Sequence, residues 1–382
     1  MKAPIRVLTP LVLCAILIAG SVFISRGEAK SGHPVQTSTI PAVASNVAGP
    51  VRPEWRLGSP HKHNNLTVFP VLADAPTTGS DHITLDEGLR SGKVIITELG
   101  ADGRSRRINR RRINDDAEVN RLSLTNKSGK PLLLLAGEMI VGGQQDRIVG
   151  HDCIIEASNT PVPLDVFCVE HGRWSGGSSF GHGVGPGDGS GGSGFNLGGG
   201  DPAPAIAQMA LPTIRQKAQA SKSQGEVWNA VEETVTVTAT ETQTGNLTSV
   251  YKNKRVNTKL GGYQRALKGR LSGGNIVGVV VAVGDKIISA DVFVNHSLFR
   301  SYWPKMLKSF ALEAVGTTSD RSKQASKTEA EAFLARVQGD STESRDAAYR
   351  LAENQSSAHA SFELEDVRKT PTLIHFNRVA KQ

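Results

Sequence analysis

Apolar residues recur along this chain at two spacings, which separate the predicted strands from the predicted helices. Runs in which apolar residues are unbroken, or alternate with polar ones, and that are rich in Val and Ile are typical of strands. These runs are bounded by Gly, Pro, Asn and Asp, the residues that favour turns. The predicted strands are 66–72, 93–99, 121–126, 132–135, 139–141, 148–149, 153–155, 166–168, 275–283, 286–294, 362–365 and 372–379.

Helical spacing is clearest in the C-terminal half. Between Ser297 and Ala314, large apolar residues recur at the three- and four-residue intervals of one helical face, and Pro304 lies within the run. Thr84 followed by Glu87 forms the capping-box pattern that starts a helix. The other predicted helices are 203–220 with an interruption at Pro212, 226–233 with a frayed end, a short helix around Tyr263, 328–338, and a helix around 347–352.

The order of these elements predicts an α+β fold. Gly284-Asp285 joins 275–283 to 286–294 as a tight hairpin, and 362–365 with 372–379 is predicted to form a terminal hairpin. Because hairpins are frequent and no strand–helix–strand repeat occurs, we expect a largely antiparallel, β-rich main domain with helices packed late in the chain.

The first 30 residues predict the compartment. Lys2 and Arg6 precede an apolar stretch from Val7 to Ile24, the layout of a secretory signal or of an uncleaved anchor. Residues 1–30 are interpreted as a signal peptide or N-terminal membrane anchor, and both alternatives stay open. Residues 31–53, rich in Ser, Pro, Ala, Thr and Val, are interpreted as a flexible spacer. We expect an exported protein, periplasmic or extracellular, that contacts the membrane only through its N-terminal segment.

The composition is that of a globular protein with excess positive charge. The 382 residues carry a net charge of +8 and include 40 glycines. No recognition helix, zinc finger or aromatic RNA-binding motif accompanies the charge, so no nucleic-acid partner is expected. Outside the cytoplasm, such a charge suits anionic lipid or cell-wall polymer equally well.

Two segments have a biased composition. Six arginines lie between 104 and 112, and they are interpreted either as an anion-binding patch or as a solvated hairpin tip neutralised by flanking acids. The second interpretation is favoured. The glycine-rich loop 176–200 is interpreted as a flexible surface insertion in preference to a flap over a pocket.

The stretch from Pro131 to Trp174 contains the densest set of polar residues between apolar strands. Polar side chains in such positions need hydrogen-bonding partners or solvent. Carboxylates and imidazoles are the usual general acids and bases, and arginines hold anionic groups. The catalytic candidates are Glu138, Asp146, Glu170 and His171, and the ligand-binding candidates are Gln145, Arg147, Arg173 and Trp174.

The alternative to a catalytic site is a structural network that pins two turns together. In that interpretation Arg147 pairs with Glu138 or Glu170, and Arg173 stacks on Trp174 or bonds to Glu170. The structural interpretation is favoured over the catalytic one.

Cys153 and Cys168 flank the turn at 159–161. If 153–155 and 166–168 form a hairpin across that turn, the two cysteines face each other, and an oxidising compartment permits a disulfide. Two free thiols are favoured, because a short cross-strand bridge requires a restrictive geometry. The spacing of His and Cys residues gives no repeated metal-ligand motif, so neither a metal nor a cofactor is expected.

Four motifs together resemble a known family. They read GEMIVGGQQDR at 137–147, CVEHGRW at 168–174, GEVW at 225–228 and WPKMLKSFAL at 303–312. Over about residues 60–315 the chain resembles the ARG and rhodanese-phosphatase-superfamily-associated protein domain, first type. That family takes its name from genomic association with ADP-ribosylglycohydrolases and rhodanese-like phosphatases, and it has no assigned activity. It often has Lys where this chain has Gln144.

The resemblance completes the predicted domain organisation. Residues 54–315 are expected to form the family-like α+β domain, including the glycine-rich loop 176–200. Residues 316–382 are expected to be a C-terminal extension of helix and strand.

Three functions remain open, and the sequence does not decide whether the chain is an enzyme. The first, favoured because no catalytic constellation is recognisable, is a non-catalytic binding or scaffold module of the cell envelope. The second is a hydrolase or transferase acting on an ADP-ribose-like or other phosphate- or ribose-containing ligand, by analogy with the associated enzymes. The third is a tether for an anionic polymer or membrane. The partner is an unknown protein or anionic ligand, and the oligomeric state is open.

The placement of the charged candidates discriminates between these functions. Convergence of Glu138, Asp146, Glu170 and Arg173 in one open cleft would favour the enzyme, and their burial in internal ion pairs would favour the scaffold. A one-sided basic face that includes 104–112 would favour the tether.

Overall fold

The computed structural model describes residues 55–74, 81–99, 120–172, 180–181, 208–318, 323–335 and 339–381. Every described residue lies in one unit, Ala42–Gln382. The predicted signal or anchor, the spacer, the arginine cluster and nearly all of the glycine-rich loop lie outside the described residues. Within the described ranges, no helix combines the length and apolar character needed to span a bilayer.

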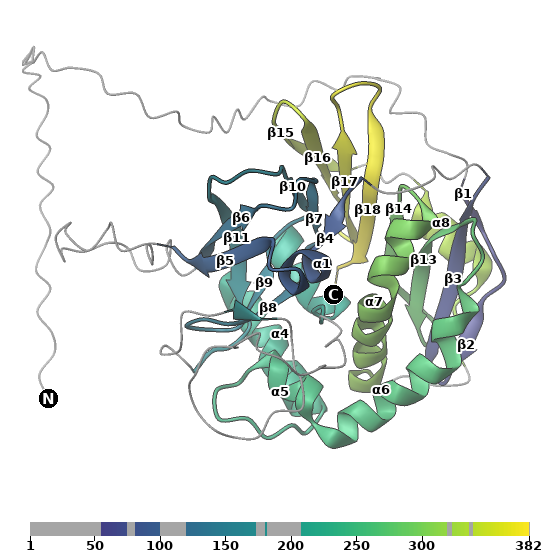
Figure 1. Ribbon diagram of the computed structural model, residues 1–382. Helices are drawn as coiled ribbons and strands as arrows, with labels where there is room; N and C mark the ends of the chain where they lie inside the picture. Colours follow the sequence, from purple (N-terminus) through teal and green to yellow (C-terminus); the bar gives the residue numbers. More distant parts are fainter. Residues whose placement is uncertain are drawn as a thin grey trace, which may run out of the picture. The chain divides into compact units, whose positions relative to one another are not determined.

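The largest sheet has nine strands and is antiparallel throughout its described pairings (Figure 1). Its strand order is β1-β3-β13-β14-β18-β17-β16-β15, and β2 pairs with β3 beside this path. The bounds are β1 (Trp55–Leu57), β2 (His61–His63), β3 (Leu66–Ala73), β13 (Ile276–Val283), β14 (Lys286–Phe293), β15 (Asp340–Arg345), β16 (Tyr349–Gln355), β17 (His359–Asp366) and β18 (Thr372–Ala380).

Two smaller sheets are built from the segment between β3 and the helices. A three-stranded sheet has the order β10-β7-β4, and a six-stranded sheet has the order β12-β8-β9-β11-β6-β5. Only the β4–β7 pair is parallel among the described pairings. The bounds are β4 (Ile83–Thr84), β5 (Val94–Glu98), β6 (Arg121–Asn126), β7 (Leu132–Leu134), β8 (Met139–Gly142), β9 (Arg147–Val149), β10 (Cys153–Ile155), β11 (Val162–Cys168) and β12 (Phe180–Gly181). The predicted α+β class with a largely antiparallel sheet is confirmed.

Most helices follow β12 in the chain. Among the described helices the exception is α1, which begins with the predicted capping box: Thr84 Oγ1 accepts from Glu87 N, and the Glu87 carboxylate accepts from Thr84 N. The bounds are α1 (Leu85–Arg90), α3 (Pro212–Gln216), the π-helix η1 (Lys217–Ser221), α4 (Gln224–Val237), α5 (Leu247–Lys252), α6 (Lys254–Leu267), the 3₁₀ helix η2 (Lys268–Arg270), α7 (His296–Gly316) and α8 (Lys327–Leu334).

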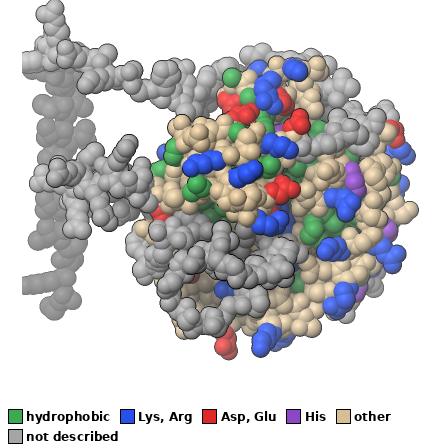
Figure 2. Space-filling view, viewed as in Figure 1, with side chains coloured by type: hydrophobic (Ala, Val, Ile, Leu, Met, Phe, Trp, Pro, Cys, Tyr) green, Lys and Arg blue, Asp and Glu red, His purple; other side chains and the backbone are tan. Residues whose placement is uncertain are grey.

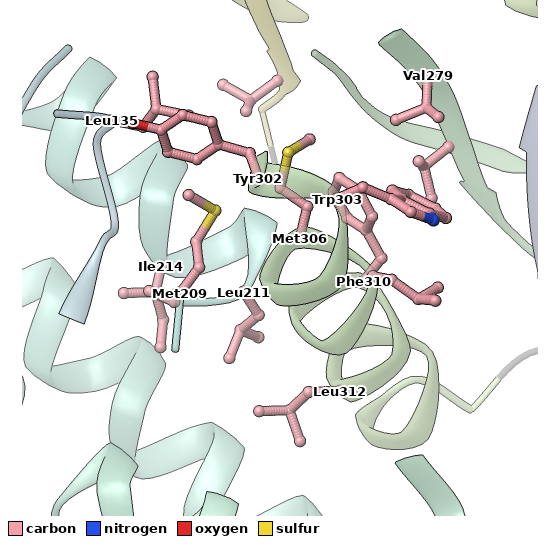
Figure 3. Close-up of a cluster of buried hydrophobic side chains, with 14 of the residues drawn as sticks. Leu135, Met209, Leu211, Ile214, Val279, Tyr302, Trp303, Met306, Phe310 and Leu312 are labelled. Carbon is pink, nitrogen blue, oxygen red and sulfur yellow. The ribbon is translucent and has the colours of Figure 1, made fainter. Parts of the chain in front are cut away.

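The core lies between α7 and one face of the largest sheet. The aromatic and aliphatic residues that predicted this helix, among them Tyr302, Trp303, Met306 and Phe310, are all buried (Figure 3). On β13, Val279 and Val281 belong to this cluster. The alternate β13 residues pack on the opposite face with Ala330 and Phe333 of α8. Because helices cover both of its faces, β13 has no polar side and reads as an unbroken apolar run.

Two predicted elements were wrong. The helix expected around 347–352 is strand β16, in which Tyr349, Leu351 and Glu353 are buried at alternate positions while β15 and β17 flank the strand. The two-residue alternation of a strand is difficult to recognise in this polar sequence. The alternate side chains become buried only when β15 and β17 lie on either side of β16. The predicted hairpin between β10 and β11 does not form, since β10 pairs with β7 and β11 pairs with β6 and β9.

Residues 316–382, which we expected as an extension, contribute α8 and the strands β15 to β18. The terminal hairpin β17–β18 forms as predicted, and β18 also pairs along its length with β14. The largest sheet is therefore continuous across residue 315.

The α7 core makes a quantitative prediction. Phe310→Ala should lower the unfolding free energy by about 3–5 kcal/mol, because it leaves a cavity at a fully buried position. Val237→Ala, at a position that is 51% exposed, should change it by less than about 0.5 kcal/mol. Urea unfolding of both variants measures the difference. Equal effects would contradict the placement of α7 in the core.

Candidate functional site

The candidate site is organised by the turn from Leu135 to Glu138, which joins β7 to β8. Gly137 N donates to Val149 O at 2.8 Å, and Ala210 N donates to Gly137 O at 2.7 Å. Gly137 has a φ of +83°, and an added Cβ would meet Arg215 Cγ at 2.4 Å. Glycine at this position therefore has a steric cause, because a larger residue would leave no room for the side chain of Arg215.

Glu138 forms a buried ion pair at the end of this turn. Its Oε1 bonds to Lys305 Nζ, and its Oε2 accepts from Leu135 N at 2.7 Å. Lys305 Nζ also lies 3.1 Å from Asp86 Oδ2, and its charge sits 4.3 Å from the centre of the Tyr302 ring. Lys305 on α7 is therefore shared between two carboxyl groups from α1 and the turn.

Burial and charge act in opposite senses on this pair. Burial raises the pKa of Glu138, and the Lys305 ammonium only partly offsets it. Burial by itself would lower the pKa of Lys305, but the Glu138 and Asp86 charges outweigh it and hold the pKa above its usual value. Lys305 is consequently a stable buried cation.

A second network lies on the other side of the turn and centres on Asp291 of β14. Arg215 Nη2 donates to Asp291 Oδ1 at 2.8 Å, and Ser289 and Asn377 each donate to Asp291 at 3.0 Å. His375 of β18 has Nε2 at 3.5 Å from Asp291 Oδ1. The Asp291, Arg215 and His375 side chains are completely shielded from solvent.

Asp152 links this network to the turn. Its Oδ2 lies 2.6 Å from His375 Nδ1, and its Oδ1 accepts from Ala136 N at 2.8 Å. Burial by itself would lower the pKa of His375, but Asp152 and Asp291 together raise it to about 8. Burial by itself would raise the pKa of both carboxyls, yet the cations beside them lower it below the usual range.

Arg147 forms a third buried pair, with a partner that the sequence did not indicate. Its Nη1 donates to Glu98 Oε1 and its Nη2 donates to Glu98 Oε2, each at 3.1 Å, in a bidentate arrangement. Nη1 also donates to Gln145 O at 3.0 Å. The expected partners, Glu138 and Glu170, were wrong, because Glu98 on β5 reaches Arg147 across the six-stranded sheet.

Asp146 and Glu170 hold loops together. Asp146 accepts from Gly142 N at 3.0 Å and from Thr248 Oγ1 at 2.5 Å. Glu170 accepts from Asp146 N at 3.1 Å and from Thr244 Oγ1 at 2.7 Å. Both are buried, and their hydroxyl donors come from the loop before α5 and from α5 itself.

Gln145 belongs to the same region. Its Nε2 donates to Glu170 O at 2.9 Å, and the side chain is buried. The structure therefore brings Gln145, Asp146 and Glu170 together, but Glu138 lies at the opposite end of the β8–β9 hairpin.

The remaining candidates have varied environments. His171 is exposed and packs edge-on to Trp228 with ring centres 4.7 Å apart. Arg173 and Trp174 lie outside the described residues. Among the described residues, no group of His, Cys, Asp and Glu has an arrangement suited to a metal ion.

The two cysteines are free thiols, so the disulfide considered from the sequence does not form in this structure. Cys153 pairs with Leu134 and Cys168 with Arg147, because the hairpin that would have faced them does not exist. Burial raises the pKa of both thiols, to about 11 for Cys168. Neither is a thiolate at neutral pH.

Sequence reasoning missed most of the charges that complete these networks. The signal that identifies them is a charged residue inside an apolar run, such as Asp291 in β14 or Lys305 in the aromatic stripe of α7. His375 alternates with apolar neighbours in β18, and it is buried and bonded to Asp152. The missed residues are Asp86, Glu98, Asp152, Arg215, Asp291 and Lys305.

The second network predicts a pH dependence of stability. The pKa of His375 is about 8 in the folded protein, above the 6.5 of a free imidazole. Its stabilising contribution is therefore complete below pH 6.5 and is lost as the pH rises to about 8, with a total of about 2 kcal/mol. Unfolding free energies on either side of this window should show the loss. His375→Gln should abolish it, whereas His171→Gln, at an exposed histidine, should retain it; the reverse result would contradict the assignment.

Gly137 predicts a steric effect that can be separated from backbone strain. Gly137→Ala and Gly129→Ala both place alanine at a positive φ, +83° and +77°, so both incur similar strain. Only the first also presses on Arg215, since nothing lies within 4 Å of a Cβ at 129. Gly137→Ala should cost about 1–3 kcal/mol more than Gly129→Ala in chemical unfolding. Equal costs would show that the arginine moves freely.

Comparison with known proteins places this arrangement in a family. The model of the ARG and Rhodanese-Phosphatase-superfamily-associated Protein domain matches residues 54–379. The match includes the turn, all three networks and the terminal hairpin, so it extends beyond residue 315. Neither the curated proteins nor the solved structures contain a match to the chain. The chain belongs to the ARG and Rhodanese-Phosphatase-superfamily-associated Protein domain family.

Proposed function

We propose that this chain is an exported protein whose domain is a non-catalytic binding or scaffold module of the cell envelope. The observation that carries the proposal is the internal engagement of the central motif. Glu138, Asp146, Arg147 and Glu170 are buried, and each is bonded to the protein itself. A general acid or base must reach substrate at hydrogen-bonding distance. These side chains direct their bonding capacity at the fold instead.

The envelope location is supported by the N-terminal sequence. Lys2 and Arg6 precede the apolar stretch from Val7 to Ile24, followed by a spacer of biased composition. A reporter enzyme that is active only outside the cytoplasm, fused to the C-terminus of the full chain, tests this part. We expect reporter activity, and its loss when Val7–Ile24 is deleted. An active cytoplasmic reporter in its place would contradict export.

A second candidate function has one observation in its favour. Clusters of buried ionisable groups with shifted pKa values are more frequent at functional sites than elsewhere. The network of Asp152, His375, Asp291 and Arg215 is such a cluster. It supports a hydrolase or transferase acting on a phosphate- or ribose-containing ligand, consistent by analogy with the association from which the family is named.

A thermal-shift screen of the unit Ala42–Gln382 decides between the two functions. The panel contains ADP-ribose, nucleotides, sugar phosphates, cell-wall fragments and divalent metals. A ligand at a hundredfold excess over its dissociation constant adds roughly 2.7 kcal/mol of stability. We expect none of the panel to produce a shift that depends on His375 or Glu138. A shift that disappears in a folded His375→Gln variant would favour the enzyme.

The structural role of Glu138 makes a separate prediction. Glu138→Gln should lower the free energy of unfolding, measured by chemical unfolding, by about 1–3 kcal/mol, because Lys305 loses one of its two carboxyl partners and retains Asp86. Glu331→Gln is the matched control: this glutamate is 53% exposed and pairs with Lys327 at 3.8 Å. The control should change stability by less than about 0.5 kcal/mol. Unchanged stability in Glu138→Gln would contradict a structural role.

A further inference from the structure

One long segment of the domain contains no acidic residue. Between Glu241 and Asp285 the chain has no Asp or Glu. The same segment carries seven cations within α5, α6 and η2 or beside them. We call these the basic face: Lys252, Lys254, Arg255, Lys259, Arg265, Lys268 and Arg270. Their number nearly equals the net charge of +8 on the whole chain.

The fold turns all seven cations outward. On α6, Val256, Leu260, Tyr263 and Leu267 are buried in the cluster that includes α7, and they occupy one side of the helix. The seven side chains of the basic face are all exposed. Figure 2 shows Lys and Arg side chains spread over the lower right of the molecule, where Figure 1 places α6.

Among the described residues, no carboxylate pairs with the basic face, although Arg255 Nη2 donates to the carbonyl oxygen of Thr238 at 3.1 Å. None of the seven cations has an ion-pair partner among the described residues, whereas Lys305, Arg147 and Arg215 inside the protein are all paired. Arg255 and Lys259 lie one helical turn apart and repel each other. Such a like-charge pair destabilises the helix. The cations therefore do not contribute to folding, and interaction with an anionic partner better explains their presence.

β2 borders the basic face. The His63 ring packs edge-on to Tyr263 of α6 with centres 5.0 Å apart. Burial and then the Arg270 charge lower the pKa of His61, which places this histidine next to the basic face. Lys62, between the two histidines, points to the opposite face of the strand, where its Nζ lies 3.3 Å from Gln324 Oε1. The basic face is therefore confined to the seven cations of α5, α6 and η2.

We propose that, beyond the membrane contact expected from the N-terminal segment, the basic face docks on a membrane surface that contains anionic phospholipid. The docking proposal rests on the proposed function only for the location of the domain in the cell envelope, close to a membrane. About 30 residues separate Ile24 from Trp55, and the spacer predicted from their composition would span on the order of 30 Å as a random coil of that length. A domain tethered in this way remains within reach of the bilayer surface, where each Lys or Arg adds to the attraction.

The side chains of the basic face favour lipid over nucleic acid. Four of the seven are lysines, whose flexible point charges suit a laterally mobile layer of phosphate groups. The aromatic residues of the same segment, Tyr251 and Tyr263, are buried and offer no surface on which bases could stack.

Vesicle co-sedimentation of the unit Ala42–Gln382 tests the proposal. This unit contains every described element and all three hydrophobic clusters, and it lacks the apolar stretch that would insert by itself. We expect binding to phosphatidylcholine vesicles that contain phosphatidylglycerol and no binding to phosphatidylcholine alone. Binding should fall steeply as salt is raised.

Two triple variants with the same change in net charge locate the binding surface. Lys254→Gln/Lys259→Gln/Arg265→Gln should weaken vesicle binding about a hundredfold. Lys93→Gln/Lys127→Gln/Lys130→Gln, at exposed positions far from α6 in the sequence, should weaken it less than about threefold. Circular dichroism and melting temperature confirm that both are folded. Equal losses in the two variants would overturn the proposal.

Three other results would also overturn the proposal. In the sedimentation, these are no binding to the anionic vesicles and equal binding to neutral vesicles. In a competition, the third is displacement from the vesicles by an oligonucleotide or a polyanionic wall polymer at concentrations below that of the lipid phosphate. The salt titration and the competition use the unsubstituted unit, so they do not depend on the variants. Failure to bind vesicles leaves the export reporter unaffected, and a cytoplasmic reporter leaves vesicle binding unaffected. The two proposals therefore fail separately.

Discussion

The constraint on which this fold depends is that a charge removed from water must be paired inside the protein. The turn at 135–138 is held from both sides by such pairs. On one side Glu138 meets Lys305 of α7, and on the other Asp152 meets His375 of β18. These contacts attach the small sheets to the largest sheet and to its covering helix. Removing one partner leaves the other buried charge with less compensation, so the pairs enforce a specific docking that apolar packing alone would not define.

The same constraint separates two kinds of charge in this molecule. Inside, each cation of the three networks is matched by a carboxylate, and its position is set by the fold. Outside, the basic face on α5, α6 and η2 has no matching carboxylate among the described residues. Interior pairing is the basis of our proposal that motif residues with catalytic chemistry act structurally, and the exposed excess of charge is the basis of our proposal of a partner for the basic face.

Local patterns succeeded where the energetics are local. The capping box at Thr84, the β13–β14 hairpin and the amphipathic α7 each depend on residues a few positions apart, and each was predicted. The failures all involve pairing at a distance. The β10–β11 hairpin was inferred from sequence proximity, but the two strands pair with different neighbours. Strand β16 was missed because its alternate side chains are buried only when β15 and β17 pair with it on either side.

The sequence by itself determined the fold class, the positions of the most apolar strands and of α7, and the presence of polar residues that needed partners. It determined these because burial preference and backbone propensity are recorded residue by residue. Only the tertiary structure decided which residues form ion pairs with one another. Asp152 and His375 are 223 residues apart in the sequence, and Glu138 and Lys305 are 167 residues apart. A charged residue in an apolar run signals that a partner exists, but its identity depends on which strands and helices meet. The physical reason is that ion pairing acts through space, and chain order does not specify which distant segments become neighbours.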